Sequence, residues 1–88
     1  MPAMPQIFID NGFEVVYGTD RDRSGAFLEL GRRSPAGWNV VAELFSAEQG
    51  GAIRLSTIED LPADVIQAFI EYGRSRLAAP GWGRLTSA

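Results

Sequence analysis

The sequence contains no cysteine, no histidine and no lysine, and all eight of its basic residues are arginine. Without cysteine there is no disulfide, no thiolate nucleophile and no cysteine-based zinc site. Without histidine there is no imidazole to act as a base near neutral pH or to bind a metal. Without lysine there is neither a Schiff-base amine nor the phosphate-binding lysine of a P-loop. We therefore expect a protein that is not an enzyme and that takes no cofactor and no metal.

Long apolar runs are also missing. No stretch approaches the 18 or so apolar residues that cross a bilayer, so we expect no membrane association. Residues 1–5 have neither the basic start nor the apolar core of a secretory signal. The sequence predicts a cytoplasmic protein.

Positive charge is scarce, with eight basic against 11 acidic residues and a net charge of −3. Nucleic-acid binding relies on clustered cations that neutralise phosphates, so this balance argues against it. It favours a partner protein with a basic surface. The exclusive use of arginine is typical of a GC-rich coding sequence and so of a bacterial or phage origin.

The 88 residues, 45% of them hydrophobic and 22% charged, match one small globular domain. Turn-forming clusters separate short runs of β-forming residues, which predict strands over 6–9, 13–18, 26–32, 38–45 and 52–57. After Pro62 the apolar residues recur at helical spacing until Pro80 stops the pattern. On this helix Gly73 lies on the apolar stripe, and we interpret it as a close-packing point against the sheet.

The predicted fold is a two-layer α+β domain. An antiparallel β-meander of four to five strands precedes one C-terminal α-helix that packs on one sheet face, in the order β-β-β-β-β-α. We expect residues 1–5 to form an N-terminal arm, 6–79 the domain and 80–88 a C-terminal tail.

Side chains alternate across a strand, which divides the predicted sheet into two faces. One phase is almost wholly apolar, includes Trp38, and should meet the helix. The other phase mixes carboxylates with aromatic and aliphatic residues and should face away from the helix. Its members are the candidate partner-binding residues Glu14, Val16, Phe27, Glu29, Val41, Glu43, Phe45 and Arg54.

Hairpin centres near the turn clusters predict how these residues pair. Glu14 would lie opposite Glu29, Glu29 opposite Glu43, and Glu43 opposite Arg54. In the alternative register, slipped by two residues, Glu29 would pair with Val41 instead. Like charges placed opposite each other destabilise a sheet, so their retention suggests docking of a partner's basic group. The alternatives are a solvated stripe that Arg54 partly neutralises, or a tail that folds over the apolar strip through Trp82.

Two further features have mainly structural interpretations. Arg21, Arg23, Arg32 and Arg33 form a candidate secondary basic patch, although the interleaved Asp20 and Asp22 argue against phosphate binding. The glycines before residue 52, including Gly18, Gly25 and Gly31, lie at or near turns, and we interpret them as turn glycines.

The sequence therefore predicts a small, acidic, non-catalytic protein-binding module. It would act sterically, as an inhibitor, immunity-type, antitoxin-like or accessory protein, through its open sheet face or an edge strand. The alternative is a structural homo-oligomer, such as a dimer, packed through the same face. Nucleic-acid binding and a carboxylate-dependent enzyme are the remaining hypotheses.

Overall fold

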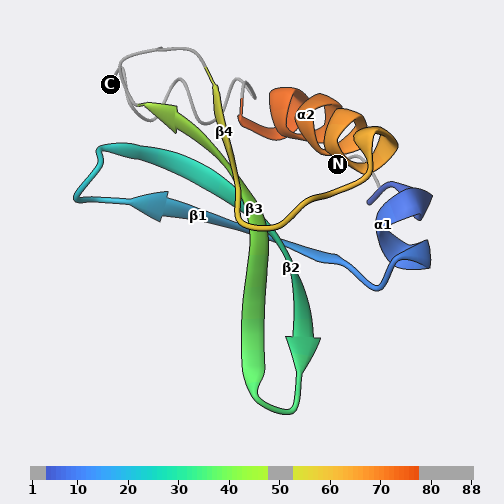
Figure 1. Cartoon of the computed structure of the whole chain (residues 1–88). Coiled ribbons are helices and arrows are strands. Elements are labelled where there is room, and N and C mark those ends of the chain that lie inside the picture. The colour runs from blue at the N-terminus through green and yellow to red at the C-terminus, as the bar shows by residue number, and fades with distance from the viewer. Residues whose placement is uncertain (1–3, 48–52, 78–88) are drawn as a thin grey trace.

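The computed structural model describes residues 4–47 and 53–77. Its elements follow the order of a helix, four strands and a second helix (Figure 1). They are α1 (Gln6–Asp10), β1 (Glu14–Asp20), β2 (Gly25–Ser34), β3 (Gly37–Ala47), β4 (Arg54–Thr57) and α2 (Ala63–Leu77).

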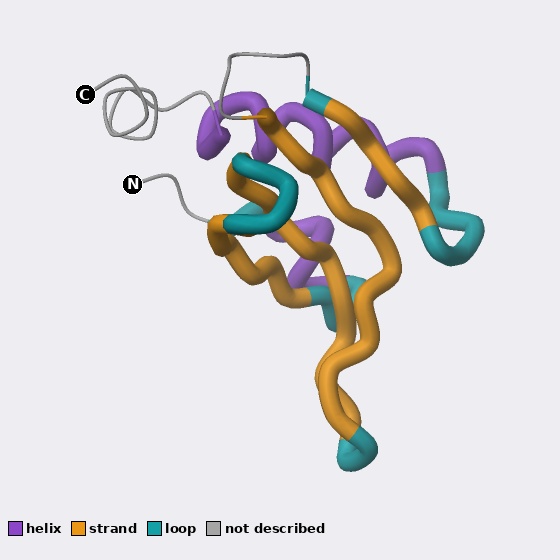
Figure 2. Tube along the Cα trace, turned by 90° about the vertical axis from the view of Figure 1, so that its left-hand side faces the viewer, coloured by secondary structure: helices purple, strands orange, loops and turns teal. Residues whose placement is uncertain are grey.

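The strands form one antiparallel sheet in the order β1-β2-β3-β4, which is a simple meander. Both helices lie on one side of this sheet, as the two perpendicular views show (Figures 1 and 2). The predicted α+β class is confirmed, and the end of the β2–β3 hairpin projects from the body as an arm (Figure 2).

Residues with turn-forming side chains or backbone conformations stabilise the turns of the β1–β2 and β2–β3 hairpins. In the β1–β2 turn, the Asp20 carboxylate accepts hydrogen bonds from the backbone N–H groups of Asp22 at 3.0 Å and Arg23 at 3.3 Å. Asp is favoured in turns because its side chain bonds to the backbone in this way. Directly after the β2–β3 turn, the first residue of β3, Gly37, adopts a φ of 125°, a conformation that favours glycine.

The core lies between the sheet and the helices. Val65, Phe69, Gly73 and Leu77 form the buried face of α2. A Cβ atom on Gly73 would overlap the Cδ1 atom of Leu44 on β3. The interpretation of Gly73 as a close-packing point is therefore confirmed.

The N-terminal segment differs from the sequence prediction. Residues 6–9 were expected to form a fifth strand, but they belong to α1. A short apolar run is compatible with either a strand or a helical turn, so its pattern does not decide between them. Tertiary packing favours the helix, because it buries the Phe8 ring fully. The ring makes edge-to-face contacts with Phe69 and Tyr72, at centroid distances of 6.2 Å and 6.1 Å.

A register shift between β2 and β3 changes which side chains face the helices. Leu30 pairs with Ala42, but the next residue, Gly31, pairs with Val40, so Val41 has no partner on β2. An extra residue of this kind reverses the alternation of the side chains beyond it. Val41 is consequently buried in the core, whereas it was predicted on the opposite face.

Trp38 was predicted in the core and is displaced by the same shift. Its indole Nε1–H donates a hydrogen bond to Glu29 Oε1 at 3.0 Å, on the face away from the helices. Alternation alone could not reveal this, because the shift is set by packing between two strands.

Within residues 4–47 and 53–77, neither helix has the length and apolar character needed to cross a membrane.

Candidate functional site: the open face of the sheet

The sheet face turned away from α1 and α2 is the candidate site, and we call it the open face. No element in the described part of the chain covers it (Figures 1 and 2). The strand register arranges its side chains in rows from β1 to β4. One row holds Gly18, Phe27, Phe45 and Arg54, and the next holds Val16, Glu29, Glu43 and Ser56.

The predicted residue pairing is correct between the two central strands, β2 and β3, but wrong between β1 and β2 and between β3 and β4. Glu29 does lie opposite Glu43. Glu14, however, lies opposite Gly31, because the β1–β2 turn takes four residues and shifts the register by two. Arg54 lies opposite Phe45 instead of Glu43.

The ring of each large aromatic residue of the open face packs against a glycine of a neighbouring strand, directly opposite for Phe27 and diagonally for Phe45 and Trp38. A Cβ atom on Gly18 would lie 2.6 Å from Phe27 Cζ, and one on Gly25 would lie 2.5 Å from Phe45 Cζ. The third pair is Trp38 and Gly31, with a corresponding distance of 2.8 Å to Cζ2. Gly18 and Gly31 lie within strands, so their interpretation as turn residues was wrong, whereas Gly25 is the first residue of β2 and borders the β1–β2 turn as predicted. They provide room for rings that no helix covers in the described chain.

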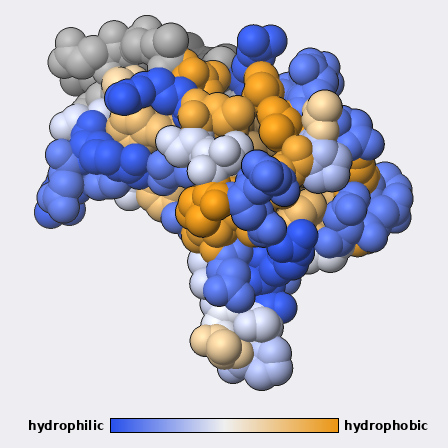
Figure 3. Space-filling view, viewed as in Figure 1, coloured by the Kyte–Doolittle hydropathy of each residue, from blue (hydrophilic) through white to orange (hydrophobic). Residues whose placement is uncertain are grey.

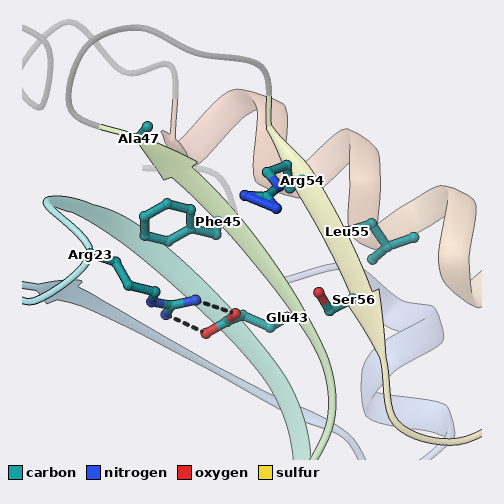
Figure 4. Close-up of a pocket in the computed structure, with 7 residues that line it drawn as sticks. All are labelled: Arg23, Glu43, Phe45, Ala47, Arg54, Leu55 and Ser56. Atoms are coloured by element: carbon teal, nitrogen blue, oxygen red, sulfur yellow. Dashed lines mark hydrogen bonds and ion pairs between the residues drawn. The ribbon is translucent and has the colours of Figure 1, made fainter.

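Arg23 covers the Phe45 ring from the turn that precedes β2. Its guanidinium carbon lies 4.3 Å from the ring centroid. The same group donates two hydrogen bonds to Glu43, from Nη1 to Oε1 at 3.0 Å and from Nη2 to Oε2 at 2.8 Å (Figure 4). Its Nε–H donates to Asp20. Phe45 is therefore only 9% exposed, although it was predicted as an open apolar anchor.

The remaining candidate arginines do not form one basic patch. Arg32 and Arg33 lie at the opposite end of β2 from the turn that holds Arg21 and Arg23. Arg32 lies over the Phe13 ring and bonds to Glu59 at 2.8 Å. Arg33 lies over Trp38 and bonds to Glu14 at 3.3 Å. The sequence pattern could not predict these long-range carboxylate partners.

The contacts around Arg23 shift two acid–base equilibria. The side-chain hydrogen bond from Arg23 is the largest cause that lowers the pKa of Asp20, and the backbone N–H groups of the turn add to it. The carboxylates of Glu43 and Asp20, in that order, raise the pKa of Arg23. Charged hydrogen bonds of this kind favour the ionised form of both partners.

We predict that Arg23→Ala raises the pKa of Asp20 toward its ordinary value of 3.8, while Arg21→Ala leaves it unchanged. A carboxyl group with a lowered pKa in the folded state adds stability above its ordinary pKa. That contribution disappears as the pH falls through the lowered value. NMR titration of the Asp20 carboxyl carbon checks the shift, and equal values in all three proteins would contradict it.

A shallow groove of about 610 Å³ runs beside Phe45 toward β4 (Figure 4). Arg54 stands on its far side, is exposed, and makes no ion pair within residues 4–47 and 53–77. The lining residues are Arg23, Glu43, Phe45, Ala47, Arg54, Leu55 and Ser56.

The β4 edge carries two exposed apolar residues that the sequence analysis did not single out as surface features. Leu55 is 38% exposed and Ile58, directly after the strand, is 72% exposed. In the space-filling view, hydrophobic residues gather above the largely hydrophilic arm (Figure 3). Within the described residues β4 pairs only with β3, so it forms an edge of the sheet.

The structure thus brings most of the predicted site residues onto one face. Val41 is absent from it, and Trp82 lies outside the described residues. Trp38, Val40 and Arg23 are the members that sequence reasoning did not place there. The first two join through the register shift, and Arg23 joins by folding back from its turn.

Comparisons with known proteins give no relative to draw on: no family model matches the chain, and no curated protein or solved structure is significantly similar to it.

Proposed function

We propose that this protein is a non-catalytic binding module that docks another protein on the open face, along the groove beside β4. The observation that supports this proposal best is the one-sided cover of the sheet. In the described chain both helices lie on one face, while the other carries three aromatic residues and a groove. Aromatic residues are enriched at the cores of protein interfaces.

The ion pairs of the arginines favour a protein over a nucleic acid as the partner. Arg23, Arg32 and Arg33 each bond to a carboxylate of the same chain. Phosphate binding would need cations free to neutralise the backbone, and the net charge of −3 opposes it further.

The same surface favours a steric mode of action over chemistry. Glu29 accepts a hydrogen bond from Trp38, and Glu43 accepts hydrogen bonds from Arg23, on an open sheet face. Acid–base catalysis by carboxylates instead requires a walled site that shifts the pKa of the catalytic group. The module would cover a functional surface of its target, as an inhibitor, an immunity-type or antitoxin-like protein, or an accessory factor does.

A matched pair of substitutions tests the docking surface. Ser56 is exposed in the groove, and Ser75 is exposed on α2. We predict that Ser56→Trp fills the groove and weakens capture of the partner from the native lysate at least about tenfold, equivalent to about 1.4 kcal/mol. Ser75→Trp adds the same side chain on the helical side and should leave capture unchanged. Equal capture by both variants would contradict the proposal.

A homo-oligomer is the second candidate, and the β4 edge favours it. An edge strand flanked by Leu55 and Ile58 can pair with the same strand of a second copy. Sedimentation from low micromolar to near-millimolar concentration separates the two candidates. A dimer that forms through β4 and is lost on Ile58→Glu would favour self-association, and a monomer throughout would favour a separate partner.

A further inference from the structure

The Arg23 side chain fills a site that is complementary to a guanidinium group. The Phe45 ring lies beneath the group, both oxygens of Glu43 accept from its Nη atoms, and Asp20 accepts from Nε. A planar fork bound to both oxygens of a carboxylate is the geometry that distinguishes arginine from lysine. An aromatic face adds a cation–π attraction.

The charges around the ring show what this site would attract without Arg23. Asp20 and Glu43 carry two negative charges, and Arg54 contributes one positive charge across the groove. The remaining net charge is negative and lies beside an aromatic ring. Such a site prefers a cation, and the two carboxylate oxygens of Glu43 prefer a guanidinium.

The Arg23 side chain can leave without loss of the turn that carries it. The turn is held by backbone N–H groups of Asp22 and Arg23, which donate to Asp20, and these bonds do not involve the guanidinium. The side chain is 44% exposed, and exposed ion pairs contribute little to stability. The groove on the other side of Phe45 leaves room for an approaching chain.

We propose that Glu43, Phe45 and Asp20 form an arginine-binding site that Arg23 occupies in the free protein and that an arginine of the partner protein takes on docking. This inference rests on the proposed function, because it names the partner's recognition group. Exchange of one guanidinium for another keeps every hydrogen bond of the site. It also releases Arg23, whose departure exposes the Phe45 ring to the partner.

The test uses Nα-acetyl-arginine amide as the probe and the amide NMR spectrum of the full chain as the readout. In Arg23→Ala the site is vacant, so we expect saturable shifts centred on Glu43 and Phe45 at millimolar probe concentration. In the wild-type protein Arg23 competes at a high effective concentration, and saturation should require at least about tenfold more probe. Nα-acetyl-lysine amide should bind the variant several-fold more weakly.

Two control variants make the result specific. Arg33→Ala also removes an arginine from above an aromatic ring, but its carboxylate partner Glu14 bonds through one oxygen at 3.3 Å. We expect it to gain no probe binding. Adding Glu43→Gln to Arg23→Ala should weaken binding at least about tenfold, since the charged two-oxygen acceptor is lost.

Several outcomes would overturn the inference. They are absence of saturable shifts in Arg23→Ala, equal binding by the wild-type protein, or binding that survives Glu43→Gln. Loss of the native spectrum in both Arg23→Ala and Arg23→Gln would show that Arg23 is structural and not replaceable. None of these results involves the partner, so a failed inference is distinguishable from a failed docking surface, which the Ser56→Trp comparison reports.

Discussion

Replacement of Phe69 by alanine should lower the free energy of unfolding by about 3–5 kcal/mol. Phe69 is fully buried on α2, and its ring meets the Phe8 ring of α1 edge to face. The truncation removes a large apolar contact and leaves a cavity between the two helices and the sheet. Total stabilities of small domains are about 5–15 kcal/mol, so the variant should lose a large part of its stability. Denaturant unfolding of both proteins measures the difference.

Phe27→Ala is the matched control for this prediction. Phe27 is half-buried on the open face, where its ring lies across Gly18 and no helix of the described chain covers it. Its truncation should cost less than half as much as that of Phe69. An equal or larger cost for Phe27 would mean that the open face is packed like a core, contrary to our assignment of the two faces.

The second large effect is expected at Gly25, where an alanine should cost about 3 kcal/mol, the upper range for overpacking. A Cβ atom at this position would overlap the carbonyl oxygen of Ser46 and the ring of Phe45. The carbonyl belongs to the adjacent strand and cannot move without disturbing the sheet. Thermal or denaturant unfolding would show the loss.

Gly18→Ala separates this steric cost from a general effect of glycine removal. Gly18 also lies in a strand, but the nearest atoms belong to the half-buried Phe27 ring, a side chain that can shift more readily than a backbone carbonyl. We expect a cost of about 1 kcal/mol, the lower end of the range for side-chain groups added to a packed site. Equal costs at Gly18 and Gly25 would contradict the steric explanation.

The parts of the fold that the sequence predicted are those with local causes. Turn residues at even spacing predicted the meander, and the change of period after Pro62 predicted α2. Gly73 was identified because a glycine on an apolar helical stripe usually allows close packing, and it does meet Leu44. The opposition of Glu29 and Glu43 followed from a hairpin whose turn is centred near residue 36.

The features that the sequence did not predict depend on contacts between distant residues. The register shift that buries Val41 and turns Trp38 outward is decided by how β2 and β3 pack. The pairing of Arg23 with Glu43 joins residues 20 positions apart, so no local pattern indicates it. The α1 helix forms because the Phe8 ring packs against α2, which lies more than 50 residues later in the chain.

Site-specific photocrosslinking tests most directly whether the open face is the working surface. A photoreactive phenylalanine analogue would replace the large, exposed Arg54 side chain at the far side of the groove or, as the matched control, Arg74 on α2, each expressed in the native host. We predict one dominant crosslinked protein for position 54 and none for position 74. A partner that crosslinks from position 74 and not from position 54 would place the interface on the helical side and contradict the proposed function.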